Sequence, residues 1–266
     1  MHHRLDCCTS AEIAGALGDP SKCCGVILPI GALEQHGPQL PLGCDMMIAR
    51  AAAESLASGL LTHQRYRAFV MPDLAYTPSP GAEDTPGTVS VGFDWMGLGL
   101  IEVLKAAMRT AWEYAIVMNG HAHNHGRVIE SSMAGTSGAL GRRVPVLAIN
   151  IYDYTNLALA HGLVPGSHAG EFETALLSYY TGCKPAGCPP GSGAVKPRPP
   201  AVFGLPILVR SMEGVVAPEV PHTARALAVA AALGADVDAA VRSGVLANLD
   251  TYYNHWHVPL QRHELP

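Results

Sequence analysis

The sequence predicts an α/β fold with a doubly wound, mostly parallel sheet and helices on both faces. Short apolar runs of strand length alternate along the chain with longer segments of helical spacing, which is the order of parallel strands and crossover helices. Hydrophobic residues make up 48% of the 266 residues and charged residues 15%, so the chain can bury a large core. No linker separates two apolar cores, and we therefore expect one domain over residues 1–266.

The first half of the chain sets this pattern. Residues 25–30 (GVILPI) form an apolar run that ends at a glycine, as a buried strand does. Residues 46–60 follow with Ala and Leu at helical spacing, and residues 68–71 (AFVM) predict a second strand. The segment 74–91 is rich in Pro, Gly, Ser and Thr, which indicates a long loop. Helical spacing returns at residues 95–114, where apolar side chains share one face.

The second half repeats the alternation. Its expected strands are residues 114–118 (YAIVM) and 144–151 (VPVLAINI), and its expected helices are residues 128–140, 168–180 and 223–241. A Pro/Gly-rich insertion is predicted at about 184–200. An aromatic and His-rich tail at 251–266 is expected to pack on the core or to reach a neighbouring subunit.

Charge and composition exclude several classes of protein. A formal net charge of −5 and a pI near 6.2 argue against nucleic-acid binding, which needs basic patches. No apolar run reaches the ~18 residues of a membrane helix. The first ten residues, MHHRLDCCTS, lack the apolar segment of a secretory signal. We expect a cytoplasmic protein whose seven cysteines are mostly buried, reduced thiols rather than a disulfide framework.

Polar side chains gather where the predicted strands end. They include Glu34, His36, Asp45, His121, His123, His168 and Glu173. In extended backbone, residues two apart point to the same side, so Glu34 and His36 converge, and so do His121 and His123. In parallel α/β sheets, ligands bind beyond the carboxyl ends of the strands. The sequence therefore predicts a site that joins several strand ends.

The residue types in these clusters indicate a metal centre. Imidazoles and carboxylates without a thiolate suit a catalytic site for zinc, manganese or iron(II). The set exceeds the needs of one tetrahedral ion, and it can hold two ions that share one carboxylate and a water, which is chemistry for hydrolysis. With 13 histidines in the chain, a chance gathering of hydrogen-bonded side chains is the alternative.

Four motifs in this chain resemble the creatininase (creatinine amidohydrolase) family. They are LPIGALEQHGPQLPLGCD at 28–45, TPGT at 85–88, MNGHAHN at 118–124 and HAGEFET at 168–174. The resemblance covers about residues 25–180 and implies a doubly wound, creatininase-like α/β domain with a dinuclear metal centre. It also implies a homo-oligomer, a hexamer or another assembly.

The resemblance implies roles for individual residues. The metal ligands are Glu34, His36, Asp45, His121 and Glu173, with Asp45 as the bridge. One ion would take Glu34, Asp45 and His121, and the other His36, Asp45 and Glu173. His168 matches the general acid/base. His123 is the second catalytic candidate, and Ser79, Asn119 and Asn124 are the candidates for substrate contact.

Two departures from the family pattern bear on the substrate. Members that cleave creatinine carry a glutamate where this chain has His123, and a tryptophan where it has Val164. A neutral donor at residue 123 removes one negative charge from the metal site. The resemblance therefore implies two divalent ions, Zn²⁺ with Zn²⁺, Mn²⁺ or Fe²⁺, and a substrate other than creatinine.

These observations predict a metal-dependent amidohydrolase that acts on a small molecule. A metal-bound hydroxide would attack an amide carbonyl of a cyclic amide, lactam or guanidine-bearing ring, and His168 would protonate the departing nitrogen. A formamide hydrolase and a peptidase for a modified peptide are the alternatives within the same chemistry. A non-catalytic metal-binding protein, and more remotely an isomerase or lyase, are the alternatives outside it.

Overall fold

The computed structural model describes residues 3–124, 126, 129, 145–164, 168–183 and 222–255. Its centre is a four-stranded sheet in the order β2-β1-β3-β4, and every neighbouring pair is parallel. The strands are β1 (Cys23–Ile30), β2 (Tyr66–Val70), β3 (Tyr114–Asn119) and β4 (Val146–Asn150). The predicted parallel sheet is thereby confirmed.

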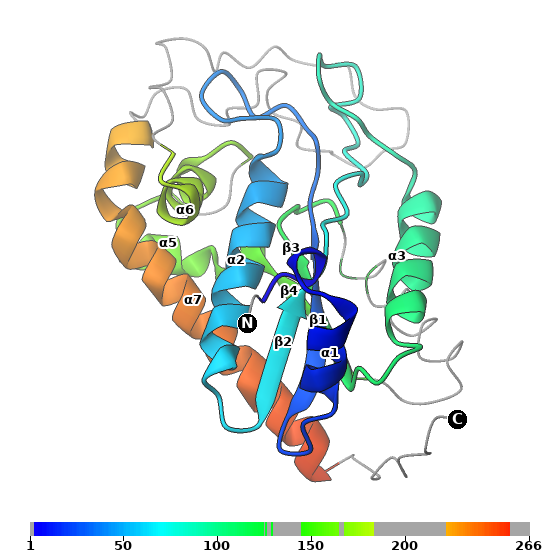
Figure 1. Cartoon of the computed structure of the whole chain (residues 1–266). Helices are drawn as coiled ribbons and strands as arrows, with labels where there is room; N and C mark the ends of the chain where they lie inside the picture. Colours follow the sequence, from blue (N-terminus) through cyan, green and yellow to red (C-terminus); the bar gives the residue numbers. More distant parts are fainter. Residues whose placement is uncertain are drawn as a thin grey trace.

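Helices cover both faces of this sheet (Figure 1). One face carries α2 (Cys44–Leu61), α5 (Asn156–Ala160), α6 (Glu171–Thr181) and α7 (His222–His255). The other face carries α1 (Ser10–Leu17) and α3 (Phe93–Ala107). Two short 3-10 turns, η1 (Leu5–Cys7) and η2 (Ile151–Tyr154), complete the described elements.

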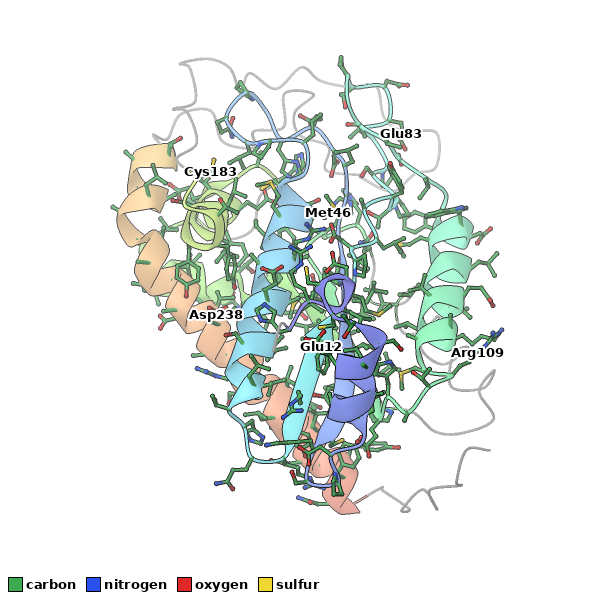
Figure 2. All side chains as sticks on the ribbon, viewed as in Figure 1. Glu12, Met46, Glu83, Arg109, Cys183 and Asp238 are labelled. Carbon is green, nitrogen blue, oxygen red and sulfur yellow. The ribbon has the colours of Figure 1, made fainter. Side chains whose placement is uncertain are left out.

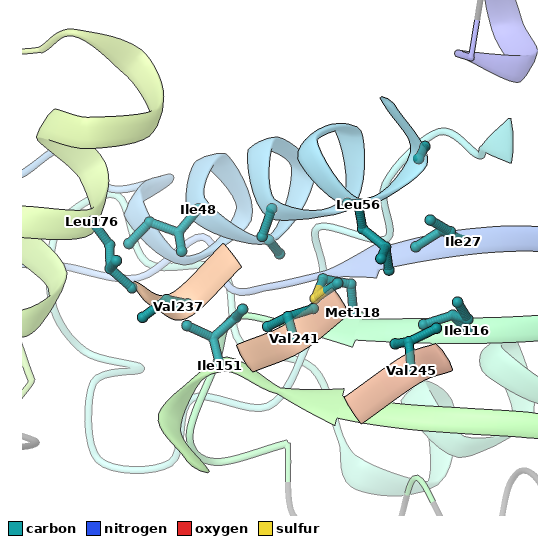
Figure 3. Packing of buried hydrophobic residues seen from close by; sticks show 14 of the residues in the cluster. Ile27, Ile48, Leu56, Ile116, Met118, Ile151, Leu176, Val237, Val241 and Val245 are labelled. Carbon is teal, nitrogen blue, oxygen red and sulfur yellow. The ribbon is translucent and has the colours of Figure 1, made fainter. Parts of the chain in front are cut away.

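The larger core lies between the sheet and the helices α2, α6 and α7. Figure 3 shows Ile27 and Met118 of the strands facing Leu56 of α2 and Val241 of α7. Because helices cover both faces, β1 and β3 are buried along their whole length and read as continuous apolar runs. Within the part of the chain that the structure describes, no helix has the length and apolar character needed to cross a membrane.

Several element boundaries differ from the predicted ones. α3 ends at Ala107 rather than at residue 114, because the chain turns so that Trp112 can pack on Phe69, with ring centroids 5.5 Å apart. α7 continues to His255 rather than ending at residue 241, because buried apolar side chains recur at helical spacing as far as Tyr253. The expected helix at 128–140 (apart from Ile129), the insertion at 184–200 and tail residues 256–266 fall outside the described residues.

The sheet order fixes where a ligand can bind. The chain leaves β1 for β2 on one side and later returns to β3 on the other side, so the carboxyl ends of β1 and β3 flank a topological switch point. Two glycines let α2 approach this point. A Cβ on Gly31 would lie 2.6 Å from the backbone nitrogen of Met46, and one on Gly120 would lie 2.2 Å from the carbonyl oxygen of Asp45.

Candidate metal centre

The structure gathers the predicted ligands at the switch point. Glu34 and His36 follow β1, and His121 follows β3. Asp45 and Glu173 lie in the first turns of α2 and α6, and all five residues are at least 97% buried. In Figure 2, the labelled residues Glu83 and Cys183 lie at the end of the molecule that holds these side chains. Arg109 lies at the other end, beyond the last turn of α3. Segments that are far apart in the sequence thus supply one buried polar cluster.

Asp45 lies between two imidazoles. Its Oδ1 is 3.1 Å from Nε2 of His36, and its Oδ2 is 2.7 Å from Nδ1 of His121. Nδ1 of His121 is also 3.4 Å from Oε2 of Glu34, and Nε2 of His36 is 3.9 Å from Oε1 of Glu173. One carboxylate therefore has an oxygen in each half of the cluster, which is the geometry of a bridging ligand.

Backbone carbonyls fix the tautomers of both imidazoles. Nδ1 of His36 donates to the carbonyl of Glu34 at 2.8 Å, and Nε2 of His121 donates to the carbonyl of Pro78 at 2.9 Å. A carbonyl oxygen only accepts hydrogen bonds, so these two nitrogens carry the hydrogens. The opposite nitrogens, Nε2 of His36 and Nδ1 of His121, face the carboxylates and are the ones available to a metal ion.

The buried charges shift the pKa of each group in the cluster. Burial alone would lower the pKa of His36, but the Asp45 carboxylate outweighs it and raises that pKa to about 10. Burial opposes ionisation of Asp45, yet His36 and His121 hold its pKa well below the usual range. Burial raises the pKa of Glu34, and it raises the pKa of Glu173 to about 8. The cluster holds three buried carboxylates that need positive charge nearby.

The residues present fit a pair of divalent ions. Two groups of three donors each have their ligand atoms within 4.8 Å of one another, namely Glu34, His121 and His123, and His36, His168 and Glu173. Asp45 touches a member of both groups. Oε2 of Glu34 and Oε2 of Glu173 are buried without a hydrogen-bond partner, although such atoms normally have one. A cation in each group would satisfy these oxygens.

His123 lies with the ligands rather than apart from them. Its ring centroid is 5.3 Å from that of His121, and the side chain is half-buried. The sequence left open whether His123 is a ligand, an acid/base or a substrate contact. Its place in a donor group with Glu34 and His121 favours a ligand role.

His168 lies beside the other group, in the turn before α6. Its ring is 4.4 Å from the ring of His36, and its Nε2 is 2.7 Å from the carbonyl of Gln35. Nε2 must donate in that bond, which leaves Nδ1 with a free lone pair. Burial, together with the charge on His36, lowers the pKa of His168 to about 3, so the imidazole is neutral near pH 7. The next residue, Ala169, has a left-handed φ of 55°. Its carbonyl oxygen accepts a hydrogen bond from Nε2 of Gln39 at 3.0 Å.

The three predicted substrate contacts are all buried, and two of them carry an unpartnered oxygen. Asn119 shapes the loop before His121, because its Oδ1 accepts from the His121 backbone N–H and its Nδ2 donates to the His121 carbonyl. Asn124 donates to the same Oδ1 of Asn119 at 2.9 Å, while its own Oδ1 is unpartnered. Oγ of Ser79 is unpartnered as well. Asn119 thus has a structural role, and the substrate roles of Ser79 and Asn124 stay predictions.

Sequence reasoning missed two contacts at this site. The Tyr152 hydroxyl donates to Oε1 of Glu173, a pairing that no spacing in the sequence could reveal. Glu171 is buried, although a first-turn carboxylate is more often solvated. It accepts from Arg225 at 2.6 and 2.7 Å and from the Val164 backbone N–H at 2.7 Å. Glu171 therefore ties α7 and the chain before His168 to the start of α6.

Comparisons with known proteins identify the family of this chain. The family model Creatininase, described as creatinine amidohydrolase, matches residues 7–185. The mycofactocin precursor peptide peptidase of Mycolicibacterium smegmatis is 40% identical over 155 residues, which cover 57% of this chain and 56% of that protein. The creatinine amidohydrolase of Pseudomonas putida is 27% identical over 182 residues, which cover 62% of this chain and 66% of that protein. The match thus spans little more than half of the length of the first relative.

Solved structures show the same fold. A mutant creatininase of Zn-Zn type has a TM-score of 0.71 at 20% identity, with 92% of this chain and 98% of that chain covered. A structure described as "Creatininase Mn" has a TM-score of 0.65 at 21% identity, with 92% and 99% covered. Because the family model matches well over half of the residues and the fold agrees, this chain belongs to the creatininase family.

Proposed function

We propose that this protein is a metal-dependent hydrolase that cleaves a C–N amide bond in a peptide. The observation that carries the proposal is the pair of donor groups joined by Asp45, with two buried carboxylate oxygens that have no hydrogen-bond partner. Bound divalent cations polarise a carbonyl oxygen and lower the pKa of a bound water. Zinc, manganese and iron(II) all suit the imidazole and carboxylate donors.

His168 lies in the donor group with His36 and Glu173, but we assign it to proton transfer rather than to metal binding, so that Asp45 completes that group of ligands. Its Nε2 hydrogen is engaged by the Gln35 carbonyl, so Nδ1 is the atom that can take a proton and later deliver it to the departing nitrogen. The low pKa of His168 keeps this nitrogen unprotonated at neutral pH. The left-handed backbone at Ala169 and its bond from Gln39 set the direction of the imidazole relative to His36.

Two observations favour a peptide over the small cyclic amide that the sequence predicts. First, the relative from M. smegmatis, 40% identical over the aligned region, is named as a peptidase of the mycofactocin precursor peptide. Second, the loops that contact the donor groups also expose apolar side chains. Leu42, Tyr76 and Val89 are 37%, 48% and 42% exposed, and Leu33 next to the site pairs with Val89 in an antiparallel bridge. We infer that these side chains contact apolar residues of a peptide.

A second candidate substrate is a cyclic amide, which the similarity to the P. putida creatinine amidohydrolase supports. A homo-oligomer and a cytoplasmic location also remain proposals, drawn from the family resemblance and from the sequence.

The test begins with protein purified without chelators and analysed for metal. We expect about two divalent ions per chain, and cleavage of the mycofactocin precursor peptide with one ¹⁸O from labelled water in the new carboxylate. Creatinine, cyclic amides and formamides serve as competing substrates in the same assay. Glu34→Gln should lose both metal and cleavage, while Glu102→Gln, at an exposed position of α3, should retain both. Cleavage of a cyclic amide alone would overturn the peptide assignment, and full cleavage without metal would overturn the proposed chemistry.

A further inference from the structure

Tyr152 lies at the carboxyl end of the fourth strand, where the sequence offered no candidate residue. It belongs to the turn η2, which follows β4 directly. Its hydroxyl donates to Oε1 of Glu173, while its ring lies 6.2 Å from that of Phe172. The bond engages Oε1, the oxygen that lies 3.9 Å from Nε2 of His36, and leaves Oε2 buried without a hydrogen-bond partner. The two oxygens of the Glu173 carboxylate therefore differ, because only Oε1 accepts a hydrogen bond from Tyr152.

A chain of hydrogen bonds extends from Tyr152 to the other half of the centre. The backbone N–H of Tyr152 donates to Oδ1 of Asn150 at 3.4 Å. The same oxygen accepts from Nδ2 of Asn119 at 3.4 Å, and Asn119 in turn holds both backbone groups of His121. The carboxyl ends of β3 and β4 are adjacent, with Asn119 paired to Asn150, so this chain of bonds runs across the edge of the sheet.

We propose that Tyr152 is a positioning residue that holds Glu173 as a one-oxygen metal ligand. The hydrogen bond between Asn119 and Asn150 connects Tyr152 with His121. One polar network therefore orients a ligand in each donor group. This inference rests on the metal centre of the proposed function, but it does not depend on the identity of the substrate. It concerns a residue outside the predicted ligand set.

A one-oxygen ligand has a chemical consequence. A carboxylate that binds through both oxygens fills two coordination positions, whereas one held by Tyr152 fills a single position. Catalytic metal sites need a position left for water or substrate. Partners that orient a ligand typically contribute about 10- to 100-fold to metal affinity. Tyr152 thus acts on both the affinity and the coordination number of the ion near His36.

The test uses Tyr152→Phe, which removes the hydroxyl and keeps the ring. We expect the affinity for one of the two ions to fall by about 10- to 100-fold in competition with a chelator, while the other ion binds as before. In cobalt-loaded protein, the visible d–d bands should weaken, because a freed Glu173 binds through both oxygens and raises the coordination number. For a cleaved substrate, kcat should fall more than KM rises.

The matched control is Tyr154→Phe, a half-buried tyrosine in the same turn. It should leave affinity and spectrum unchanged. A second variant, Asn150→Ala, should weaken binding of both ions. Asn150 accepts hydrogen bonds both from Asn119, which orients His121, and from the backbone of Tyr152, which orients Glu173. Tyr152→Phe protein with wild-type affinities and spectrum would overturn the proposal and leave the proposed function intact. Wild-type protein that binds no cobalt, zinc or manganese would overturn both.

Discussion

The backbone of Gly120 touches the backbone of Asp45, so closely that a Cβ on Gly120 would lie 2.2 Å from the Asp45 carbonyl oxygen. This contact sets the distance between the end of β3 and the first turn of α2. It also brings the carboxylate of Asp45 to His121. The geometry of the centre therefore depends on a residue that has no side chain.

Gly120→Ala should accordingly damage the centre as well as the fold. Neither contacting backbone can yield easily, so we expect a loss of about 1–3 kcal/mol in the free energy of unfolding together with reduced metal content. Urea titration and elemental analysis measure the two effects. Gly99→Ala is the matched control, because its Cβ would meet nothing within 4 Å in the helix α3. That variant should gain roughly 0.5–1 kcal/mol, and an equal response of both variants would contradict the argument.

The metal-free protein should lose stability as the pH rises above 6.5. The pKa of His36 is raised to about 10, so its stabilising contribution is complete below the ordinary pKa of 6.5 and disappears as pH passes through 10. Urea unfolding in the presence of a chelator should show this fall between pH 6.5 and 9, and Glu173, whose pKa burial raises to about 8, adds a loss of the same sign up to pH 8. Above pH 9 the buried thiol of Cys23, whose pKa is raised from 9.0 to about 12, adds a loss of the same sign.

Asp45→Asn provides the control for this pH dependence. The variant removes the carboxylate that holds the proton on His36, so the slope between pH 6.5 and 9 should flatten. Asp94→Asn, in the first turn of α3, should keep the slope of the wild type. A slope that persists in Asp45→Asn would show that another group causes it.

His123 should determine which metal fills the group that it shares with Glu34 and His121. We expect His123→Ala to lower the metal content from near two ions per chain to near one, as measured by elemental analysis. His123→Glu should restore the second ion and shift the preference toward manganese, because carboxylates suit Mn²⁺ better than imidazoles do. His161→Ala is the control, since His161 pairs with Asp236 at the surface. Two tightly bound ions in His123→Ala would rule out a ligand role.

The exposed side chains beside the centre should govern substrate binding more than turnover. Replacing both Tyr76 and Val89 by Ser should raise KM for a peptide substrate by about tenfold, equivalent to about 1.4 kcal/mol, with little change in kcat. Leu159→Ser, an equally apolar change on the exposed face of α5, should leave KM unaltered. A fall in kcat at constant KM would mean that these residues act on the centre instead.

The sequence was a good guide to the strands and to the gathering of the candidate ligands. Apolar runs bounded by glycine and polar residues mark β1 and β3, and parallel strands necessarily bring their carboxyl ends to one edge. Glu34, His36 and His121 follow those ends directly, so local pattern and topology together predict where they meet.

Features that depend on packing between residues far apart in the sequence were harder to predict from the sequence. The end of α3 is set by Trp112 packing on Phe69, which helical spacing alone does not reveal. The last turns of α7 are helical because Tyr253 packs near Tyr66 and its hydroxyl donates to the carbonyl of Glu113 at 3.0 Å. The sequence left open whether those aromatic residues pack on the core or reach a neighbouring subunit, and Tyr253 belongs to the core. The hydrogen bond between Tyr152 and Glu173 is a similar case, since the two residues lie 21 positions apart in the sequence.

The carbonyl groups that orient His36 and His121 belong to the main chain, at Glu34 and Pro78. Every amino acid supplies such an acceptor, so substitutions along the loop 74–92 need not disturb the orientation of either imidazole. The same loop displays Tyr76 and Val89 to solvent. Evolution could therefore change the surface that we propose to meet the substrate, while the main-chain carbonyl of Pro78 in the same loop still accepts from Nε2 of His121. Side chains of the loop can therefore change, and with them the substrate that we propose it binds, while the main chain still orients His121 for the proposed reaction.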